Sequence, residues 1–296
     1  MNILLTGASG YLGSHLARVL VSDGYRLTVL KREGSDIRRI IDIGADLACY
    51  DIESGGVQQA FRGASYDAVV HTATCYGRGG ESAADVCAAN TAWPLELMDA
   101  AASAGTPLFI NTDTSLERFL NPYALSKKQF TDWGHLFADQ GRIRFVNVVL
   151  EHFYGPGDLE SKFVTKVIRS CLRGDRRLDL TAGIQRRDFI HIDDVVAAYT
   201  LILRHALVDG IPFQEFCIGS GTAIAIRDLV VMIRALSGSD IELHFGAVPL
   251  RTNEPMESLA DTSALQALGW QPRTGLEGGL SRTIEIEKEL MKGKTP

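Results

Sequence analysis

The stretch TGASGYLGSHL, residues 6–16, decides the fold because it joins an apolar run to an amphipathic segment through three glycines. The preceding NILLT predicts a buried strand, and the residues after it predict a helix. Gly7 permits a tight turn, Gly10 lets a pyrophosphate approach the backbone, and Gly13 allows close contact between helix and strand. A glycine triplet alone also occurs in ordinary turns, but its place between strand and helix predicts dinucleotide binding. The residues of this turn expected to line the cofactor are Gly7, Ser9, Gly10, Tyr11, Leu12 and Gly13.

Outward from this turn, short apolar runs alternate with helical patterns through the first half of the chain. Helices are expected near 37–43, around 83–104 and after Pro122, between strands that are apolar throughout because helices cover both faces of a parallel sheet. The pattern predicts an α/β fold, a Rossmann-like doubly wound parallel sheet. We expect a dinucleotide-binding domain over 1–153, with part of 187–220 interleaved in it, and a smaller α/β substrate-binding region over 154–296.

Length and composition exclude several classes of protein. The 296 residues are 46% hydrophobic and carry a net charge of -6, which favours a globular chain and argues against nucleic-acid or anionic-membrane binding. The five cysteines form no CxxC pair and no cluster with histidine, so no metal site or disulfide framework is expected. With no basic and apolar leader and no run long enough to span a bilayer, we expect a cytoplasmic protein whose partner is a small molecule.

The end of the second strand bears on the choice of cofactor. An acidic residue that would bind the ribose is replaced there by Lys31 and Arg32, and the nearest acid, Glu33, is displaced. Two cations attract a 2′-phosphate, so the sequence favours NADPH over NADH, although a solvated basic turn is the alternative. Asp51 and Ile52 follow the third strand and are expected beside the adenine, or else in an acidic turn.

A tyrosine and a lysine four residues apart form the candidate catalytic pair. Tyr123 and Lys127 fall on one face of the helix that Pro122 begins, and Thr112 stands where the preceding strand ends. An ammonium beside the phenol is expected to lower its pKa from about 10 by about 1–3 units, which suits a general acid or base. In most proteins such a pair lies on the surface; beside the glycine turn we favour catalysis, with Thr112 and Tyr123 binding one substrate oxygen.

The chain resembles the extended short-chain dehydrogenase/reductase family, also described as the NAD-dependent epimerase/dehydratase family. The resemblance rests on TGASGYLG, Asn90, YALSK at 123–127, YGPGD at 154–158, RRDFIHIDDV at 186–195 and LGWQP at 268–272. It implies a Rossmann domain that binds NAD(P) and a second region that binds a nucleotide-linked sugar. It also implies that Asp51, Ala73 and Asn90 contact the cofactor and that Thr112, Tyr123 and Lys127 form the catalytic trio, with Thr114 as the alternative to Thr112.

Within the resemblance, one motif decides between reactions. The dehydratase branch uses Thr-Asp-Glu, and here Thr112, Asp113 and Thr114 lack the glutamate that would act as base, which disfavours elimination. Segments 75–83, 150–158, 162–172 and 180–189 are similar to bacterial NADPH-dependent reductases of CDP-linked 4-keto-3,6-dideoxyhexoses, most closely the paratose synthases and next the abequose synthases. The resemblance implies that Tyr76 and Arg78 meet the sugar.

The remaining candidate substrate contacts have ordinary structural alternatives. Arg187 and Arg251 match positions that grip the diphosphate, but they are also placed to pair with Asp188 and Glu254. The other candidates are Asp113, which is placed equally well to cap a turn, His152, which is placed equally well to pack, and Lys162. Asp193 and Asp194 are expected to cap a helix, and no metal is expected.

Three functions remain open at the level of sequence. The first is an NADPH-dependent 4-ketoreductase acting on a CDP-dideoxyhexose, giving CDP-paratose or CDP-abequose. The second is a nucleotide-sugar 4-epimerase that retains NAD, and the third is a non-catalytic NADP-binding regulator. The resemblance also implies a homodimer built on the fourth and fifth helices.

Overall fold

The computed structural model describes residues 1–43, 47–251 and 253–293, and it divides into two compact units. The first unit comprises Met1–Leu150 together with Val196–Phe216, and the second comprises Glu151–Val195 together with the chain from Cys217 onward. The segment that returns to the first unit therefore lies inside the range 187–220, and the break falls after Leu150 where the sequence placed it after residue 153. Within the described ranges, no helix is long and apolar enough to cross a membrane.

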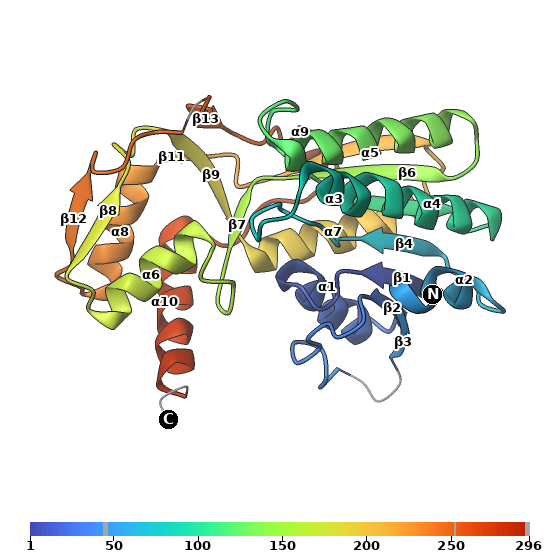
Figure 1. Ribbon diagram of the computed structural model, residues 1–296, viewed down its shortest axis with the longest axis horizontal. Coiled ribbons are helices and arrows are strands. Elements are labelled where there is room, and N and C mark those ends of the chain that lie inside the picture. Colours follow the sequence, from blue (N-terminus) through green and yellow to red (C-terminus); the bar gives the residue numbers. More distant parts are fainter. Residues whose placement is uncertain (44–46, 252, 294–296) are drawn as a thin grey trace. The chain divides into compact units, whose positions relative to one another are not determined.

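A seven-stranded sheet forms the centre of the first unit (Figure 1). Its order is β10-β6-β5-β4-β1-β2-β3, and every neighbouring pair from β6 to β3 is parallel. The strands are β1 (Asn2–Thr6), β2 (Arg26–Lys31), β3 (Ala48–Asp51), β4 (Ala68–His71), β5 (Leu108–Thr114), β6 (Arg144–Leu150) and β10 (Phe213–Ile218). The chain order reverses between β1 and β4, and in open α/β sheets ligands bind at the carboxyl ends of strands beside such a reversal. The predicted doubly wound sheet is confirmed.

Helices connect these strands and bury their apolar faces on the sheet. They are α1 (Tyr11–Ser22), the 3₁₀ turn η1 (Ile52–Ser54), α2 (Gly56–Phe61), α3 (Ala83–Cys87), the π-helical segment η2 (Ala88–Ala92), α4 (Trp93–Ser103), α5 (Pro122–Asp139) and α7 (Ile192–Ala206). The Asn121 side chain accepts a hydrogen bond from the Ala124 N–H, and Pro122 takes the first position of α5, so the helix begins where the sequence predicted. The core beneath α4 and α5 contains Phe109, Phe130 and Phe145.

The second unit holds two smaller sheets. The first sheet pairs β9 (Arg186–His191) with β7 (His152–Tyr154), β11 (Ala223–Ala225) and β13 (Glu257–Ser258), and the second pairs β8 (Arg177–Leu180) with β12 (Glu242–Phe245). Helices α6 (Phe163–Arg173), α8 (Ile226–Ser237) and α10 (Leu276–Lys292) pack on one another, and α9 (Ser263–Ala267) is a short helix near the carboxyl end. Tyr154, Phe189 and Leu280 lie in the apolar core of this unit.

The helix expected near 37–43 does not form, and that prediction was wrong. Residues 38–42 form a turn instead, in which the Ile40 N–H bonds to the carbonyl three residues back. Side chains hold the segment in this shape: Asp36 binds Arg38, while the Arg18 guanidinium on α1 binds both the Asp42 carboxylate and the Arg39 carbonyl. Local side-chain bonds of this kind compete with the backbone bonds of a helix.

Candidate functional site

The glycine turn has the close packing that its sequence predicts. The Gly10 N–H donates to the Gly7 carbonyl at 2.8 Å, and Gly10 then stands as the N-cap of α1. Gly7 has a φ of 74°, and a Cβ there would lie 2.6 Å from the Ala73 nitrogen at the end of β4. A Cβ on Gly13 would lie 2.1 Å from the Gly7 carbonyl oxygen. Glycine is therefore required at both positions, and no side chain of the N-cap residue Gly10 caps the start of α1, the kind of helix end at which a phosphate binds.

The ends of β1 and β4 are tied together beside this turn. The Thr6 hydroxyl is 2.8 Å from His71 Nδ1, and the Thr72 hydroxyl donates to the Thr6 carbonyl at 2.8 Å. His71 has no exposed surface, and its ring packs near Trp93 and Phe109. Burial lowers the pKa of His71 far below its ordinary value, so the imidazole is neutral. This residue supports the shape of the turn and does not act as an acid.

An ion pair joins the last residues of β2 and β3. The register of these strands places Lys31 opposite Asp51, and the Lys31 ammonium is bonded to the Asp51 carboxylate. Asp51, expected beside the adenine, is therefore the partner of one of the two cations expected to bind a 2′-phosphate. Arg32 is exposed, and the Glu33 N–H is capped by Glu53. The Lys31 charge is thus paired with Asp51, whereas the Arg32 side chain is exposed to solvent.

Tyr123 lies with the two residues expected to meet the sugar. Its ring centroid is 5.0 Å from that of Tyr76, and the Arg78 guanidinium carbon is 5.5 Å from the Tyr76 ring centre. Burial raises the pKa of Tyr123 above its ordinary value, with Tyr76 adding to the rise, and a hydrogen bond from Thr114 opposes it. The expected fall in the pKa was wrong because desolvation of the phenol exceeds the stabilisation of its anion. The phenol therefore rests in its protonated form.

The two threonines of β5 have different partners. The Thr112 hydroxyl lies 2.7 Å from the hydroxyl of Tyr199 on α7, while Thr114 is the threonine that acts to lower the pKa of Tyr123. Thr114 was the alternative to Thr112 at the level of sequence. Thr114 is therefore the threonine that influences Tyr123, and Thr112 is hydrogen-bonded to Tyr199, which sequence reasoning missed.

Lys127 is buried at the foot of the same helix turn. It is 1% exposed, and its ammonium lies 3.5 Å from Asn111 Oδ1. Asn111 in turn donates to Asn147 Oδ1 on β6 at 2.8 Å. Burial lowers the pKa of Lys127 from 10.5 to about 8, and Asp113 opposes the shift. The lysine is thus held where its charge is costly, as at many functional sites.

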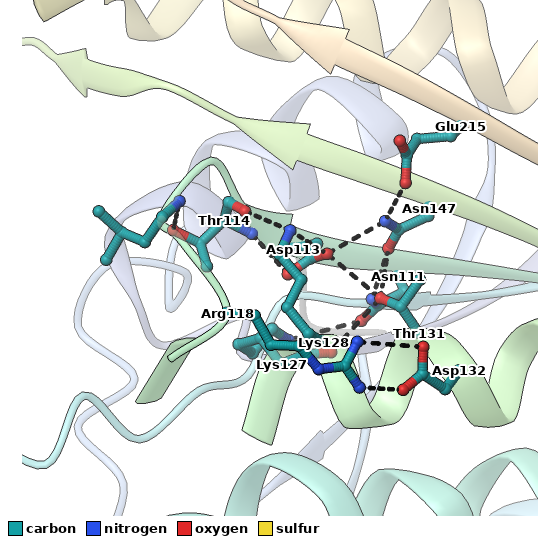
Figure 2. Close-up of polar contacts among 11 residues, drawn as sticks. Asn111, Asp113, Thr114, Arg118, Lys127, Lys128, Thr131, Asp132, Asn147 and Glu215 are labelled. Carbon is teal, nitrogen blue, oxygen red and sulfur yellow. Dashed lines mark hydrogen bonds and ion pairs between the residues drawn. The ribbon is translucent and has the colours of Figure 1, made fainter. Parts of the chain in front are cut away.

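The Asp113 side chain points toward Lys128 and Asn147 and is buried in the protein (Figure 2). Successive residues of a strand point to opposite faces, so Thr112 faces α7 while Asp113 faces α5. Its carboxylate accepts hydrogen bonds at 2.7–3.2 Å from the groups Lys128 Nζ, Asn147 Nδ2, Thr131 Oγ1 and the Thr114 N–H. Asp113 is 2% exposed and every one of these donors belongs to the protein, so the carboxylate has a structural role here, and its contact with a substrate stays a prediction.

Replacing Asp113 with asparagine is expected to destabilise the protein by about 2 kcal/mol or more. The amide cannot accept all four bonds, and it leaves the Lys128 ammonium beside an uncharged group. Urea unfolding measures the loss. The matched control is Asp132→Asn, because Asp132 pairs with Arg118 in solvent and a surface pair contributes little. An unchanged urea midpoint with a raised KM for the sugar nucleotide would instead return Asp113 to the substrate.

Asn90 lies in the π-helical segment and has no exposed surface. Its Oδ1 accepts from the Cys75 N–H at 2.7 Å, and its Nδ2 donates to the Cys75 carbonyl at 2.8 Å and to Ser126 Oγ at 3.0 Å. The amide is thus engaged by the loop after β4 and by α5, and the implied cofactor contact stays a prediction. Asn90 fixes the loop that carries Tyr76 and Arg78 against the helix that carries Tyr123.

The arginine candidates lie in the second unit. Arg187, on β9, is 6% exposed and donates to Glu254 Oε1 at 2.8 Å and to the Pro255 carbonyl at 2.6 Å. Its expected partner, Asp188, instead accepts from the backbone and hydroxyl of Ser220. Glu254 therefore belongs to Arg187 rather than to Arg251, which is exposed.

The other candidates of the second unit are held by neighbouring strands. His152 begins β7, and its Nδ1 lies 3.4 Å from Glu151, whose carboxylate also accepts from Ser258 on β13. Lys162 is the N-cap of α6. Asp194 accepts from the N–H groups of Arg273 and Thr274 at 2.9 Å, so it fixes a loop. Among the residues that the structure describes, no group of three or more His, Cys, Asp or Glu is arranged to hold a metal ion.

Sequence reasoning missed a set of residues that support the candidate site from neighbouring strands and helices. They are Asn111, Lys128, Thr131, Asn147, Tyr199 and Glu215. The polar pair Asn111 and Asn147, within otherwise apolar strands, was the available signal, because buried amides in a sheet need partners. The register that places them opposite each other is given by the structure alone.

Comparison with known proteins gives a family and several relatives. Residues 3–214 match the model of the NAD dependent epimerase/dehydratase family. A CDP-abequose synthase of Salmonella typhimurium is 31% identical over 297 residues, covering 96% of this chain and 97% of that protein. A UDP-glucose 4-epimerase of Lactobacillus helveticus is 26% identical over 317 residues, covering 92% of each. The crystal structure of a Thermus thermophilus UDP-glucose 4-epimerase with NAD superimposes with a TM-score of 0.85 at 21% identity, covering all of both chains, and shares the fold.

Proposed function

Because the chain belongs to the NAD dependent epimerase/dehydratase family of nucleotide-sugar enzymes, we propose that it reduces the 4-keto group of a nucleotide-linked deoxyhexose with NADPH. The observation that carries the proposal is the place of Tyr123, whose ring lies 5.0 Å from that of Tyr76 and which shares α5 with the buried Lys127. Burial raises the pKa of Tyr123, so the phenol carries its proton at neutral pH. A resting proton donor suits reduction of a ketone, in which the oxygen must receive a proton.

The first unit has the features that a dinucleotide requires. The cradle at Gly7 and Gly13 would be filled by any Cβ, and it lets a pyrophosphate approach the backbone at the start of α1. When bound, NADPH supplies a hydride to the carbonyl carbon. Tyr123 then gives its phenolic proton to the carbonyl oxygen, and the hydrogen bond from Thr114 stabilises the phenolate that remains. Lys127 adds a positive charge on the same helix face.

We propose a CDP-linked 4-keto-3,6-dideoxyhexose as substrate and CDP-abequose or CDP-paratose as product. The full-length similarity to a CDP-abequose synthase supports this substrate class. Arg187 and Arg251, with His152 and Lys162, are the residues we assign to the nucleotide diphosphate. Because Arg187 is bonded to Glu254, the diphosphate would have to compete with that carboxylate.

Arg32→Ala is expected to weaken NADPH binding by about 10–100-fold, the contribution of one charge-assisted contact, and to leave NADH binding nearly unchanged. The reason is that Arg32 is the exposed cation, whereas Lys31 is already paired with Asp51. Asp51→Asn is the matched control and should strengthen NADPH binding, because it releases the Lys31 charge. Fluorescence titration of both cofactors measures the effects, and equal losses of NADPH and NADH would refute the assignment.

The deciding experiment follows NADPH absorbance with a panel of CDP-, UDP- and dTDP-linked 4-keto sugars and assigns the C4 configuration of the product by NMR. Oxidation of NADPH with a CDP-linked 4-keto sugar is the expected result. The second candidate is a 4-epimerase, favoured by the similarity to the Lactobacillus enzyme. Purification with tightly held NAD, together with interconversion of a UDP-hexose and no net oxidation of NADPH, would establish that function instead.

A further inference from the structure

Strand β5 ends with two hydroxyl groups on one face. Thr112 and Thr114 are two residues apart, so their side chains project to the same side of the sheet. Each hydroxyl has one proton to donate and two lone pairs to accept with. What each threonine offers a ligand therefore depends on which of these its protein partner occupies.

The partner of Thr112 is Tyr199, whose hydroxyl lies 2.7 Å from Thr112 Oγ1. Tyr199 is 2% exposed, and burial raises the pKa of its phenol, so it keeps its proton at neutral pH. A phenol is a stronger donor and a weaker acceptor than an aliphatic alcohol. Within the described residues, Thr112 is the hydrogen-bond partner found for this phenol, and a buried O–H that donates to no acceptor is costly. The bond therefore runs from Tyr199 to Thr112.

The Thr114 hydroxyl also accepts a hydrogen bond from the protein, in this case from a backbone N–H. Its Oγ1 accepts from the Leu116 N–H at 3.3 Å, which leaves its proton for another acceptor. Both threonines thus accept from the protein behind them and keep their own proton for the site. Thr112 is only partly buried, so its hydroxyl remains accessible to a ligand.

We propose that Tyr199 is a positioning residue that fixes the Thr112 hydroxyl as a hydrogen-bond donor to the oxygen on C4 of the sugar. The proposal rests on the 4-ketoreductase function. During reduction this oxygen gains negative charge before Tyr123 protonates it, and a donor already oriented toward it stabilises the transition state more than the ground state. Tyr199 touches neither substrate nor cofactor in this arrangement, and it acts through Thr112 alone.

A double-mutant cycle tests the proposal with the variants Tyr199→Phe, Thr112→Val and the two combined. Thr112→Val should lower kcat by about 10²-fold, as loss of one oxyanion donor does, while Thr112→Ser should restore most of it. Tyr199→Phe should lower kcat by about threefold to tenfold, the size of one neutral hydrogen bond, with a smaller effect on KM. In the Thr112→Val background the same change should have no further effect on kcat, because the group that it orients is absent.

Tyr66→Phe is the matched control. Its buried phenol donates to the Ala60 carbonyl at 2.9 Å in the same unit, so its loss removes one buried hydrogen bond outside the site. It should lower the urea midpoint without changing kcat. Equal losses of kcat from Tyr199→Phe in both backgrounds, or a loss of the same size from Tyr66→Phe, would overturn the proposal.

The cycle also separates this proposal from the proposed function. A wild-type protein that reduces no 4-keto sugar would refute the reductase function, and the four proteins would then be compared by their urea midpoints. A Tyr199–Thr112 hydrogen bond makes the two losses of stability non-additive, and a non-additive result would support the pairing. Additive losses would remove the bond on which the positioning role depends and would overturn it.

Discussion

Tyr123→Phe is expected to lower kcat for NADPH oxidation by about 10²–10⁴, the usual contribution of a general acid. The change removes one oxygen and keeps the ring that lies 5.0 Å from Tyr76, so binding of the cofactor and the sugar nucleotide should change little. Stopped-flow turnover and fluorescence titration of NADPH measure the two effects separately. Turnover like that of the wild type would refute the role of Tyr123 and would favour the non-catalytic regulator.

The raised pKa of Tyr123 bears on whether the residue is better suited to reduction or to oxidation of the sugar. A phenol that keeps its proton is ready to reduce a ketone, whereas oxidation of a 4-hydroxyl first needs the phenolate to accept a proton. An epimerase must perform both half-reactions in one site, and a reductase performs one. The raised pKa of this half-buried tyrosine therefore suits the reduction that we propose.

Lys127→Met is expected to raise the melting temperature at pH 7 by several degrees while lowering turnover by about 10²-fold. The fall of the Lys127 pKa from 10.5 to about 8 means that folding disfavours its charged form, by about 3 kcal/mol. Methionine keeps most of the volume and removes that cost. Calorimetry against pH checks the stability effect, and the NADPH assay checks the turnover.

The sign of the pH dependence follows from linkage. Between pH 8 and 10.5 the unfolded chain binds more protons at Lys127 than the folded protein, so this group makes the wild type more stable as pH rises. The difference between Lys127→Met and wild type should thus be largest below pH 8 and should shrink toward pH 10.5. Lys128→Met, one residue along, is the control of opposite sign, because it leaves the buried Asp113 carboxylate without its cation. A lower melting point for Lys127→Met at pH 7 would show that the Lys127 charge is compensated.

The parts of the molecule that follow from local pattern were predictable. The glycine turn, the alternation of strands and helices, and the start of α5 at Pro122 each depend on residues close in sequence, and the structure has all three. The family was predictable as well, because its motifs lie at fixed places along the chain.

The parts that depend on register between distant strands were not predictable. Lys31 meets Asp51 because β2 and β3 align them, and Asn147 reaches both Asp113 and Glu215 because β6 lies between β5 and β10. Single-sequence reasoning assigned Asp51 and Asp113 to ligands and could not show the protein groups to which the structure pairs them. It also expected the Lys127 charge to lower the pKa of Tyr123, whereas burial is the largest effect and raises that pKa.

The π-helical segment at Ala88–Ala92 has a consequence for how this chain can vary. A wider turn holds one residue more than an α-helical turn, so side chains beyond it are out of phase by about 100° with those before it. The apolar faces of α3 and α4 are therefore rotated relative to each other about the helix axis, and Asn90 lies in the π-helical segment between them. Deletion of a single residue here would remove this rotation and turn the Asn90 amide away from Cys75 and Ser126. We therefore expect the number of residues in this segment to matter as much as their identity.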